Sequence, residues 1–558
     1  MSETYYEFYP GKFEKKINAA LKRIDEQHII DRIRKHDHTV WKEYPNEITN
    51  RLGWLDSPDN TQDIIPEIDS FVQEICQSKF SNILLLGMGG SSLAPEVLGR
   101  MFARREGYPA LIVLDTTDPD TIHAMETQID LEHTFFLVAT KSGGTVETIS
   151  LMKYFYNRVI DIAGPDQAGS FFGAITDPGS GLEKEARLLH FRKVFLNDPT
   201  IGGRYSALSL FGMVPAALSG IDISLILKKA SEFARQTLSG TDRSAVVLGT
   251  ALGVLAAEGR DKLTIIGEAH WLELGPWIEQ LIAESTGKEG KGILPVVHEG
   301  QLNPADYTAD RIYIFLENED KSAIKPLKEG LVKAGHPVIA LLAGAPENIG
   351  IQFYMWEMAT VIAGHCMQIN PFDQPNVESA KEKARQLMGI YKQTGKIQHP
   401  EKICSDRNFD LYGEISGANP AEILNVFISS NRRPGGYIAI HAYIPYDPKS
   451  DAVLYGMRDK IRNKYNMTTT VGYGPRFLHS TGQLHKGDAG RGIFLQILSR
   501  PVQDKGIPDV PGKKDGYISF GNLKDAQAFG DREALISSGR KVLTIVLKND
   551  LHALLSLI

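Results

Sequence analysis

The strongest constraint on the fold of this chain is a pattern that repeats from about residue 80 onward: a short apolar run, a turn rich in Gly or Ser, and a longer amphipathic stretch. This pattern is typical of strands and helices that alternate around a parallel sheet. It predicts one series of strands over residues 82–87, 110–115, 134–140, 171–176 and 193–196. A second series is predicted over residues 263–267, 292–297, 311–316 and 337–342. We therefore expect an α/β fold with two parallel sheets and flanking helices.

The chain beyond about residue 400 has a different pattern, in which Gly- and Pro-rich loops separate the predicted strands. These cover residues 435–444, 468–472, 492–498, 516–520 and 542–547, and they indicate a mixed α/β region. The first 60 residues contain charged, helix-like stretches. At roughly 100 to 200 residues per domain, a chain of 558 residues has room for several units. We predict a helical N-terminal arm (1–60), two α/β domains (61–240 and 241–400) and a C-terminal α/β region (401–558).

The composition excludes several classes of protein. A net charge of -7 argues against a nucleic-acid-binding surface, which requires dense Lys and Arg. The three cysteines are odd in number and widely spaced, which fits neither a disulfide framework nor a zinc site. No run reaches the ~20 apolar residues that span a bilayer, and the N-terminus lacks the apolar core of a signal peptide. We expect a cytoplasmic protein with no membrane, nucleic-acid or metal partner.

Two predicted strands of the first series end in turns suited to an anion. One turn contains Gly90 and Ser91, and its glycines let the backbone approach a ligand at a helix N-terminus. The other carries three hydroxyls and one cation, which together suit a phosphate monoester. Its candidate residues are Thr140, Lys141, Ser142 and Thr145. The alternative interpretation is a tight turn without ligand in the first case and a capped helix start in the second.

Three further segments supply charged and amide side chains. In the string Gly202-Gly203-Arg204-Tyr205-Ser206, glycines would bring the Arg204 guanidinium close to a ligand. Gln280 and Glu284 are four residues apart and share one face of a predicted helix, where Glu284 could serve as a general base. A lone Arg is usually a surface residue, and a lone Glu near a helix end is usually ordinary.

The last segment reads Phe372-Asp373-Gln374-Pro375-Asn376-Val377-Glu378-Ser379-Ala380-Lys381. Gln374 and Lys381 lie seven residues apart, two helical turns, and could face one side of a ligand. Taken alone, this segment is a loop followed by a helix start. Its meaning depends on the other segments.

Together these five segments resemble the glucose-6-phosphate isomerase family over roughly residues 80 to 385. The resemblance implies two sugar-isomerase (SIS) domains and isomerisation of glucose 6-phosphate to fructose 6-phosphate through a cis-enediolate, with no cofactor. It assigns Glu284 as the catalytic base, and it places Gly203 and Arg204 at the enediolate. Lys381 corresponds to the lysine near the sugar ring oxygen. The substrate contacts that it implies are Gly90, Ser91, Thr140, Lys141, Ser142, Thr145, Gln280 and Gln374.

The chain departs from the family pattern after Gly287-Lys288, where a Gly-Gln-His string is absent. The C-terminal region offers His479-Ser-Thr-Gly482-Gln483-Leu-His485-Lys486-Gly487 instead. In this respect the chain resembles the isomerase half of bifunctional transaldolase/glucose-6-phosphate isomerase proteins. We predict His485, in preference to His479, as the residue that assists opening of the sugar ring near neutral pH. The alternative is that both histidines only face solvent.

The sequence therefore predicts an aldose-ketose isomerase of glycolysis and gluconeogenesis that binds a sugar phosphate and could form a homodimer. Two alternatives remain open: an isomerase of another phosphorylated aldose, and a phosphosugar-binding regulator without turnover. The second would need the phosphate turn but not the base Glu284.

Overall fold

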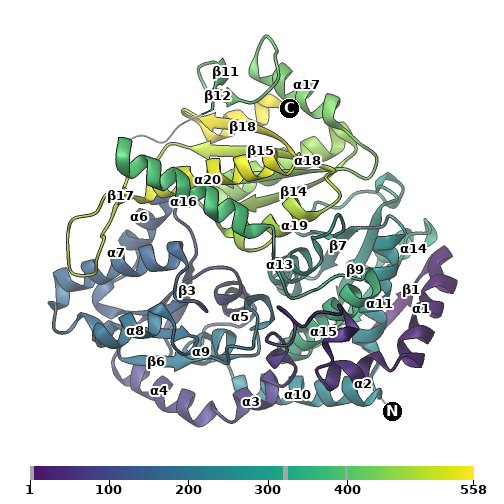
Figure 1. Ribbon diagram of the computed structural model, residues 1–558, viewed down its shortest axis with the longest axis horizontal. Helices are drawn as coiled ribbons and strands as arrows, with labels where there is room; N and C mark the ends of the chain where they lie inside the picture. Colours follow the sequence, from purple (N-terminus) through teal and green to yellow (C-terminus); the bar gives the residue numbers. More distant parts are fainter. Residues whose placement is uncertain (1–4, 318–323, 396–399) are drawn as a thin grey trace.

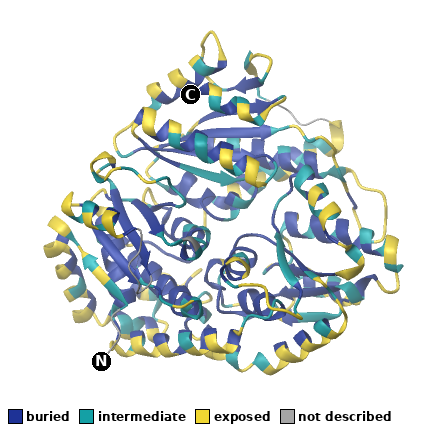
Figure 2. Cartoon of the chain, turned by 180° about the vertical axis from the view of Figure 1, so that it is seen from behind, coloured by how far each residue is buried: buried dark blue, intermediate teal, exposed yellow. Residues whose placement is uncertain are grey.

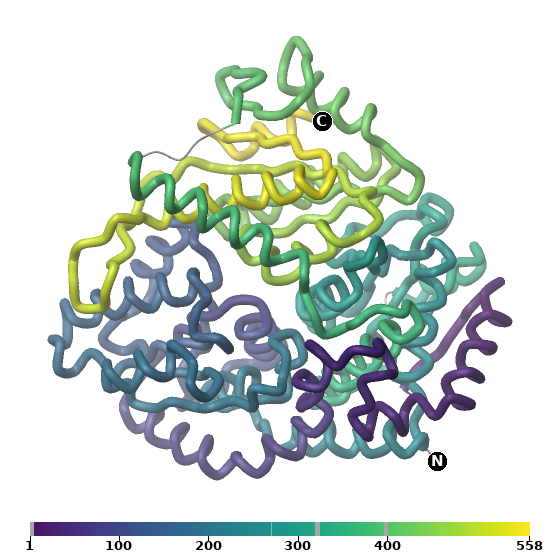
Figure 3. The backbone as a smooth tube through the Cα atoms, in the orientation of Figure 1, coloured from purple at the N-terminus to yellow at the C-terminus, as the bar shows by residue number. Residues whose placement is uncertain are grey.

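The computed structural model describes residues 5–317, 324–395 and 400–558. Its three main sheets lie at the corners of a triangle, as Figures 1 and 3 show, and each is flanked by helices. Figure 2 shows buried strands inside each unit and exposed outer faces on the surrounding helices. Among the described residues, no helix combines the length and the apolar character needed to cross a membrane.

The first unit is a five-stranded parallel sheet in the order β3-β2-β4-β5-β6. Its strands are β2 (Asn82–Gly87), β3 (Ala110–Leu114), β4 (Thr134–Ala139), β5 (Phe172–Thr176) and β6 (Lys193–Leu196). Its helices are α3 (Ser57–Gln62), α4 (Ile65–Gln77), α5 (Leu93–Met101), α6 (Pro119–Gln128), α7 (Val146–Ala163), α8 (Gly181–Leu188), α9 (Leu210–Leu218) and α10 (Ile223–Ser239). The strands β2 and β4 are continuous apolar runs because helices cover both faces of the sheet.

The second unit has the strand order β1-β10-β9-β7-β8, with all strands parallel except β1. Its strands are β1 (Tyr6–Tyr9), β7 (Lys262–Gly267), β8 (Leu294–Val296), β9 (Arg311–Glu317) and β10 (Val338–Leu342). Its helices are α1 (Glu14–Glu26), α2 (Ile29–Arg34), α11 (Ser244–Ala257), α12 (Ala269–Leu272), α13 (Gly275–Thr286), α14 (Lys325–Lys333) and α15 (Ile349–Met367). The N-terminal segment is thus not purely helical, because its first strand extends this sheet at the β10 edge.

The third unit is a six-stranded mixed sheet in the order β11-β12-β18-β15-β13-β14. Its strands are β11 (Lys402–Ser405), β12 (Phe409–Tyr412), β13 (Tyr437–Tyr443), β14 (Thr468–Tyr473), β15 (Gly492–Ser499) and β18 (Lys541–Leu547). Its helices are α16 (Val377–Thr394), α17 (Pro420–Asn431), α18 (Pro448–Tyr465), α19 (Gly482–Gly487) and α20 (Phe520–Ser537). The four strands β14, β13, β15 and β18 are parallel. At the other edge, β12 pairs antiparallel with β18, and β11 pairs antiparallel with β12.

The strand predicted over residues 516–520 is shorter than expected and lies outside the six-stranded sheet. Only Ile518–Ser519 (β17) is a strand, and it pairs with Gly506–Ile507 (β16) in a separate two-stranded ribbon. The reason is local: the Ser519 hydroxyl accepts a hydrogen bond from the Asn522 amide and caps α20, which begins at Phe520.

The third unit packs closely on the first. Ile507, Phe520 and Leu523 join the hydrophobic core on one face of the first sheet. Beside them, the Lys524 ammonium lies 2.8 Å from the Asp118 carboxylate, and both side chains are fully buried. Arg476 forms ion pairs with Glu96 and, at 3.4 Å, with Asp115. A buried pair stays favourable only when its geometry is fixed, so these contacts hold the two units in one register.

Candidate active site

Two glycine turns of the first unit pack against each other and begin the site. Gly89–Ser91 (η4) follows β2, and Gly203–Tyr205 (η7) precedes α9. A Cβ atom on Gly90 would lie 1.9 Å from the carbonyl oxygen of Gly203, so no side chain fits there. The predicted residues Gly90, Ser91 and Gly203 are therefore brought together, and the contact fixes the backbone that carries Arg204.

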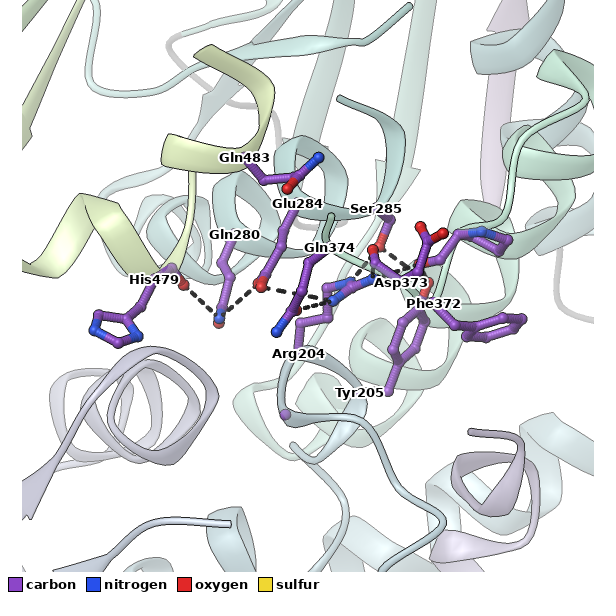
Figure 4. A network of polar contacts seen from close by, with 12 residues as sticks. Arg204, Tyr205, Gln280, Glu284, Ser285, Phe372, Asp373, Gln374, His479 and Gln483 are labelled. Carbon is purple, nitrogen blue, oxygen red and sulfur yellow. Dashed lines mark hydrogen bonds and ion pairs between the residues drawn. The ribbon is translucent and has the colours of Figure 1, made fainter. Parts of the chain in front are cut away.

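The Arg204 guanidinium is buried and held by hydrogen bonds on all three nitrogens (Figure 4). Nε donates to the Ser285 hydroxyl at 2.7 Å, and Nη1 donates to the Gln374 amide oxygen at 2.9 Å. Nη2 donates to the carbonyls of Pro371 at 2.7 Å and Asp373 at 3.1 Å. These bonds pre-organise the cation, so it need not reorient when charge develops beside it.

The Glu284 carboxylate lies beside this cation, with Oε1 3.6 Å from Arg204 Nη1. Its other oxygen accepts a hydrogen bond of 3.1 Å from Gln280 Nε2, as the spacing on α13 predicts. Gln280 Nε2 also donates to the backbone oxygen of His479 at 2.8 Å, whereas Gln280 Oε1 is buried and has no hydrogen-bond partner among the described residues. This amide thus retains one acceptor for a ligand hydroxyl.

A cavity of about 530 Å³ lies between the first and third units and is linked to this network through His479, which lines it and whose backbone oxygen binds Gln280. Its lining includes Ser142 and Thr145 from the turn after β4, Lys381 from α16, and His479. The turn leads into α7, an 18-residue helix whose first amides and positive dipole end are suited to bind an anion at this position. Lys381 contributes a second positive charge, with its ammonium 3.0 Å from Glu378.

Two residues of the predicted phosphate turn do not line the cavity. Lys141 Nζ donates to the Asp177 carboxylate at 2.5 Å and to the Pro199 carbonyl at 2.7 Å. The Thr140 hydroxyl bonds that of Thr145 at 2.9 Å. Both side chains therefore support the turn from its sides, and Ser142 and Thr145 are left to face a ligand.

His479 is the histidine that the structure brings to the cavity. It ends a short 3-10 helix of the third unit, Arg476–His479 (η10), and its Nε2 lies 3.0 Å from Glu147 Oε1. Burial acts to raise the pKa of Glu147, but the charge and the hydrogen bond of His479 outweigh burial and lower that pKa below its usual value. An ionised carboxylate only accepts, so His479 Nε2 carries a hydrogen and Nδ1 takes no part in this contact.

The structure places His485, the predicted ring-opening residue, away from the cavity. Its side chain is 2% exposed on α19, and Nδ1 lies 3.0 Å from His441 Nε2. Burial, followed by the charge of His441, lowers the pKa of His485 well below its usual value. The helix is tightly enclosed, because a Cβ on Gly487 would lie 2.2 Å from the Gly287 carbonyl oxygen. His485 is thus a buried neutral side chain in this arrangement.

Lys288 supports the Arg204 site. The sequence assigned it no role, although it follows the helix that carries Glu284 by two residues. Its ammonium is almost fully buried and lies 2.7 Å from the Asp373 carboxylate. Burial, and then the charge of Arg204, lower the pKa of Lys288 to about 8, although Asp373 acts in the opposite direction. The pair fixes the segment whose carbonyls bind Arg204.

Sequence reasoning missed Glu147 and Ser285 as members of the site. Their positions in the sequence could have indicated them. Glu147 follows Thr145 by two residues at the start of α7, and Ser285 follows Glu284 directly. Among the described residues, no group of three or more His, Cys, Asp or Glu side chains is placed to hold a metal ion.

Comparison with known proteins agrees with this geometry. A sequence model of the phosphoglucose isomerase family matches residues 15–293, half of the 558 residues. The chain belongs to this family. A glucose-6-phosphate isomerase of Rubrobacter xylanophilus is 29% identical over 356 residues, which are 54% of this chain and 82% of that relative. One of Carboxydothermus hydrogenoformans is also 29% identical, over 64% of this chain and 90% of that relative.

Solved structures show the same fold for this phosphoglucose isomerase family member. A glucose-6-phosphate isomerase from Chlamydia trachomatis matches with a TM-score of 0.58 at 19% identity, covering 70% of this chain and 89% of that chain. A hypothetical protein from Thermus thermophilus also has a TM-score of 0.58, at 22% identity, over 69% of this chain and 99% of that chain. The α/β fold with parallel sheets and the sugar-isomerase resemblance are confirmed. The matched family segment ends before the third unit begins.

Proposed function

We propose that this chain interconverts glucose 6-phosphate and fructose 6-phosphate by proton transfer through a cis-enediolate, with Glu284 as the base. The observation that carries the proposal is the buried Glu284 carboxylate, 3.6 Å from a guanidinium whose nitrogens are all fixed by hydrogen bonds. When Glu284 removes the proton next to the carbonyl, negative charge passes from the carboxylate to the enediolate. Arg204 stabilises both charges without moving.

The phosphate of the substrate would lie at the N-terminus of α7, against Ser142 and Thr145. From there the sugar would extend past His479, whose carbonyl binds the Gln280 amide, toward Glu284. Gly90, Ser91, Gly203 and Gln374 act through Arg204, which they hold beside Glu284. Thr140 and Lys141 act by holding the phosphate turn.

Ring opening needs a group that takes the proton of the anomeric hydroxyl and a group that protonates the ring oxygen. We assign this step to His479, oriented by Glu147, and to Lys381, which line the same cavity. The assignment replaces His485, whose burial leaves it no access to a ligand. Glu284 then acts on the open chain and returns the proton to the neighbouring carbon.

The family supports the isomerase over a regulator without turnover, since a regulator needs the phosphate turn but no base beside Arg204. We also propose that the chain works in glycolysis and gluconeogenesis in the cytoplasm, on the ground of its family. The homodimer and the absence of a nucleic-acid partner stay predictions from the sequence. So does the division of the chain at residues 60, 240 and 400.

The proposal is tested by incubating the purified chain with glucose 6-phosphate in deuterated water. We expect fructose 6-phosphate to form, with solvent deuterium entering the transferred hydrogen position. Formation of a ketose from another aldose phosphate, with glucose 6-phosphate inert, would contradict the assignment of substrate.

A further inference from the structure

We propose that Gln527, from helix α20 of the third unit, is a positioning residue for ring opening that fixes the carboxylate of Glu147 beside His479. This inference rests on the proposed role of His479. It adds a residue far from every segment by which the sequence indicates an isomerase site.

The contact is direct, and the two side chains that form it are buried. Gln527 Nε2 donates to Glu147 Oε1 at 2.7 Å, and the same oxygen lies 3.0 Å from His479 Nε2. The Thr117 hydroxyl donates to Gln527 Oε1 at 2.7 Å. Thr117, Glu147 and Gln527 are at most 4% exposed, so these bonds are largely shielded from water.

Thr117 decides which end of the amide faces Glu147. Rotating the amide by half a turn would point its carbonyl oxygen at an ionised carboxylate, which repels it. With its oxygen bonded to Thr117, the amide presents its N–H group to Glu147. The carboxylate oxygen then has two donors from the third unit, Gln527 and His479, and has one preferred orientation.

Gln527 lines the cavity together with His479, but this N–H group is bonded to Glu147. Its effect on the reaction therefore passes through the Glu147 carboxylate. Without Gln527, Glu147 keeps one donor fewer and can rotate, so His479 loses the fixed orientation of its ring. The loss should fall on ring opening and spare the proton transfer by Glu284.

The third unit contains a matched control. Gln496 is fully buried, donates to the Ala528 carbonyl of α20 at 2.7 Å, and accepts a 3.0 Å hydrogen bond from a threonine hydroxyl, that of Thr544. It has the same chemistry as Gln527 but does not contact Glu147. The variants Gln527→Leu and Gln496→Leu thus remove equivalent amides. Only the amide of Gln527 is bonded to the carboxylate that contacts His479.

The experiment measures kcat and KM of both variants on cyclic glucose 6-phosphate and on an open-chain aldose phosphate, each also in a His479→Asn background. For Gln527→Leu we expect about a tenfold lower kcat on the cyclic substrate, the size of one hydrogen bond to a charged group. KM and the open-chain rate should change less than about twofold, and in the His479→Asn background the loss should nearly vanish. Gln496→Leu should leave the kcat on the cyclic substrate within about twofold.

Equal losses in both variants, equal losses on both substrates, or an undiminished loss in the His479→Asn background would overturn the proposal. If Gln527→Leu does not fold, as judged by circular dichroism, Thr117→Val takes its place, with a loss of about threefold in the same pattern expected. An unchanged Thr117→Val would then overturn it. A wild-type chain without isomerase activity would instead refute the proposed function.

Discussion

The two halves of the proposed active site are built differently. The cluster around Arg204 and Glu284 lies between the first two units. The Arg204 guanidinium donates hydrogen bonds to Ser285, Pro371 and Gln374, which belong to two short segments, 280–288 and 370–376. The ring-opening half, His479, reaches the first unit from the third and depends on single contacts to Glu147 and Gln280. In the first half, every nitrogen of the Arg204 guanidinium is held by a hydrogen bond. In the second half, the position of His479 depends on the packing of the third unit against the first.

The largest effect should come from removing the base. Glu284→Gln keeps the shape of the side chain and its contact with Gln280 but cannot accept a proton, so we expect kcat to fall about 10³- to 10⁴-fold. Substrate affinity, measured by calorimetry, should change little. Substrate hydrogen exchange with solvent at C2 should be lost with turnover, and exchange that persists in this variant would show that another group is the base.

The phosphate turn offers a smaller and more discriminating effect. Ser142→Ala removes a hydroxyl that faces the cavity, and a hydrogen bond to a charged phosphate predicts a Kd about tenfold higher. Lys141→Met removes a side chain bonded to Asp177 and Pro199, and we expect a change of less than about threefold. Calorimetry with a sugar phosphate measures both. A larger effect at Lys141 would place its ammonium on the phosphate.

The smallest effect concerns pH. Since the pKa of Lys288 is lowered to about 8, its ammonium is present below that pH and becomes an amine above it. Loss of the charge weakens the contact with Asp373, which positions Arg204, so we expect kcat to decline a few-fold as pH rises through about 8. In Lys288→Gln this decline should disappear, at a lower kcat throughout. A decline at the same pH in the variant would assign it to another group.

The same contrast explains what the sequence could predict. The strands of the first two units follow from apolar runs bounded by Gly, and the segments around Arg204, Glu284 and Lys381 carry their chemistry within a few residues. By contrast, Glu147 contacts His479 and Gln527, which lie 332 and 380 positions away in the sequence. No local spacing of residues reveals such contacts.

The preference for His485 followed from its nearness to the pair Gly482-Gln483, but that pair serves packing. The Gln483 amide donates to the Gly287 carbonyl at 2.9 Å, and Gly487 approaches the same carbonyl closely. These contacts turn α19 inward and bury His485. The short strand β1 was missed for a related reason: a four-residue edge strand is defined by its partner β10, and its own sequence carries little signal.

The most direct test of the central claim compares His479→Asn with His485→Asn on cyclic glucose 6-phosphate and on an open-chain aldose phosphate. If the third unit supplies the ring-opening group through His479, then His479→Asn lowers kcat/KM about 10²-fold on the cyclic substrate and less than about threefold on the open chain. His485→Asn should affect both substrates equally, through stability. Selective loss with the cyclic substrate in His485→Asn, together with full activity in His479→Asn, would contradict the account.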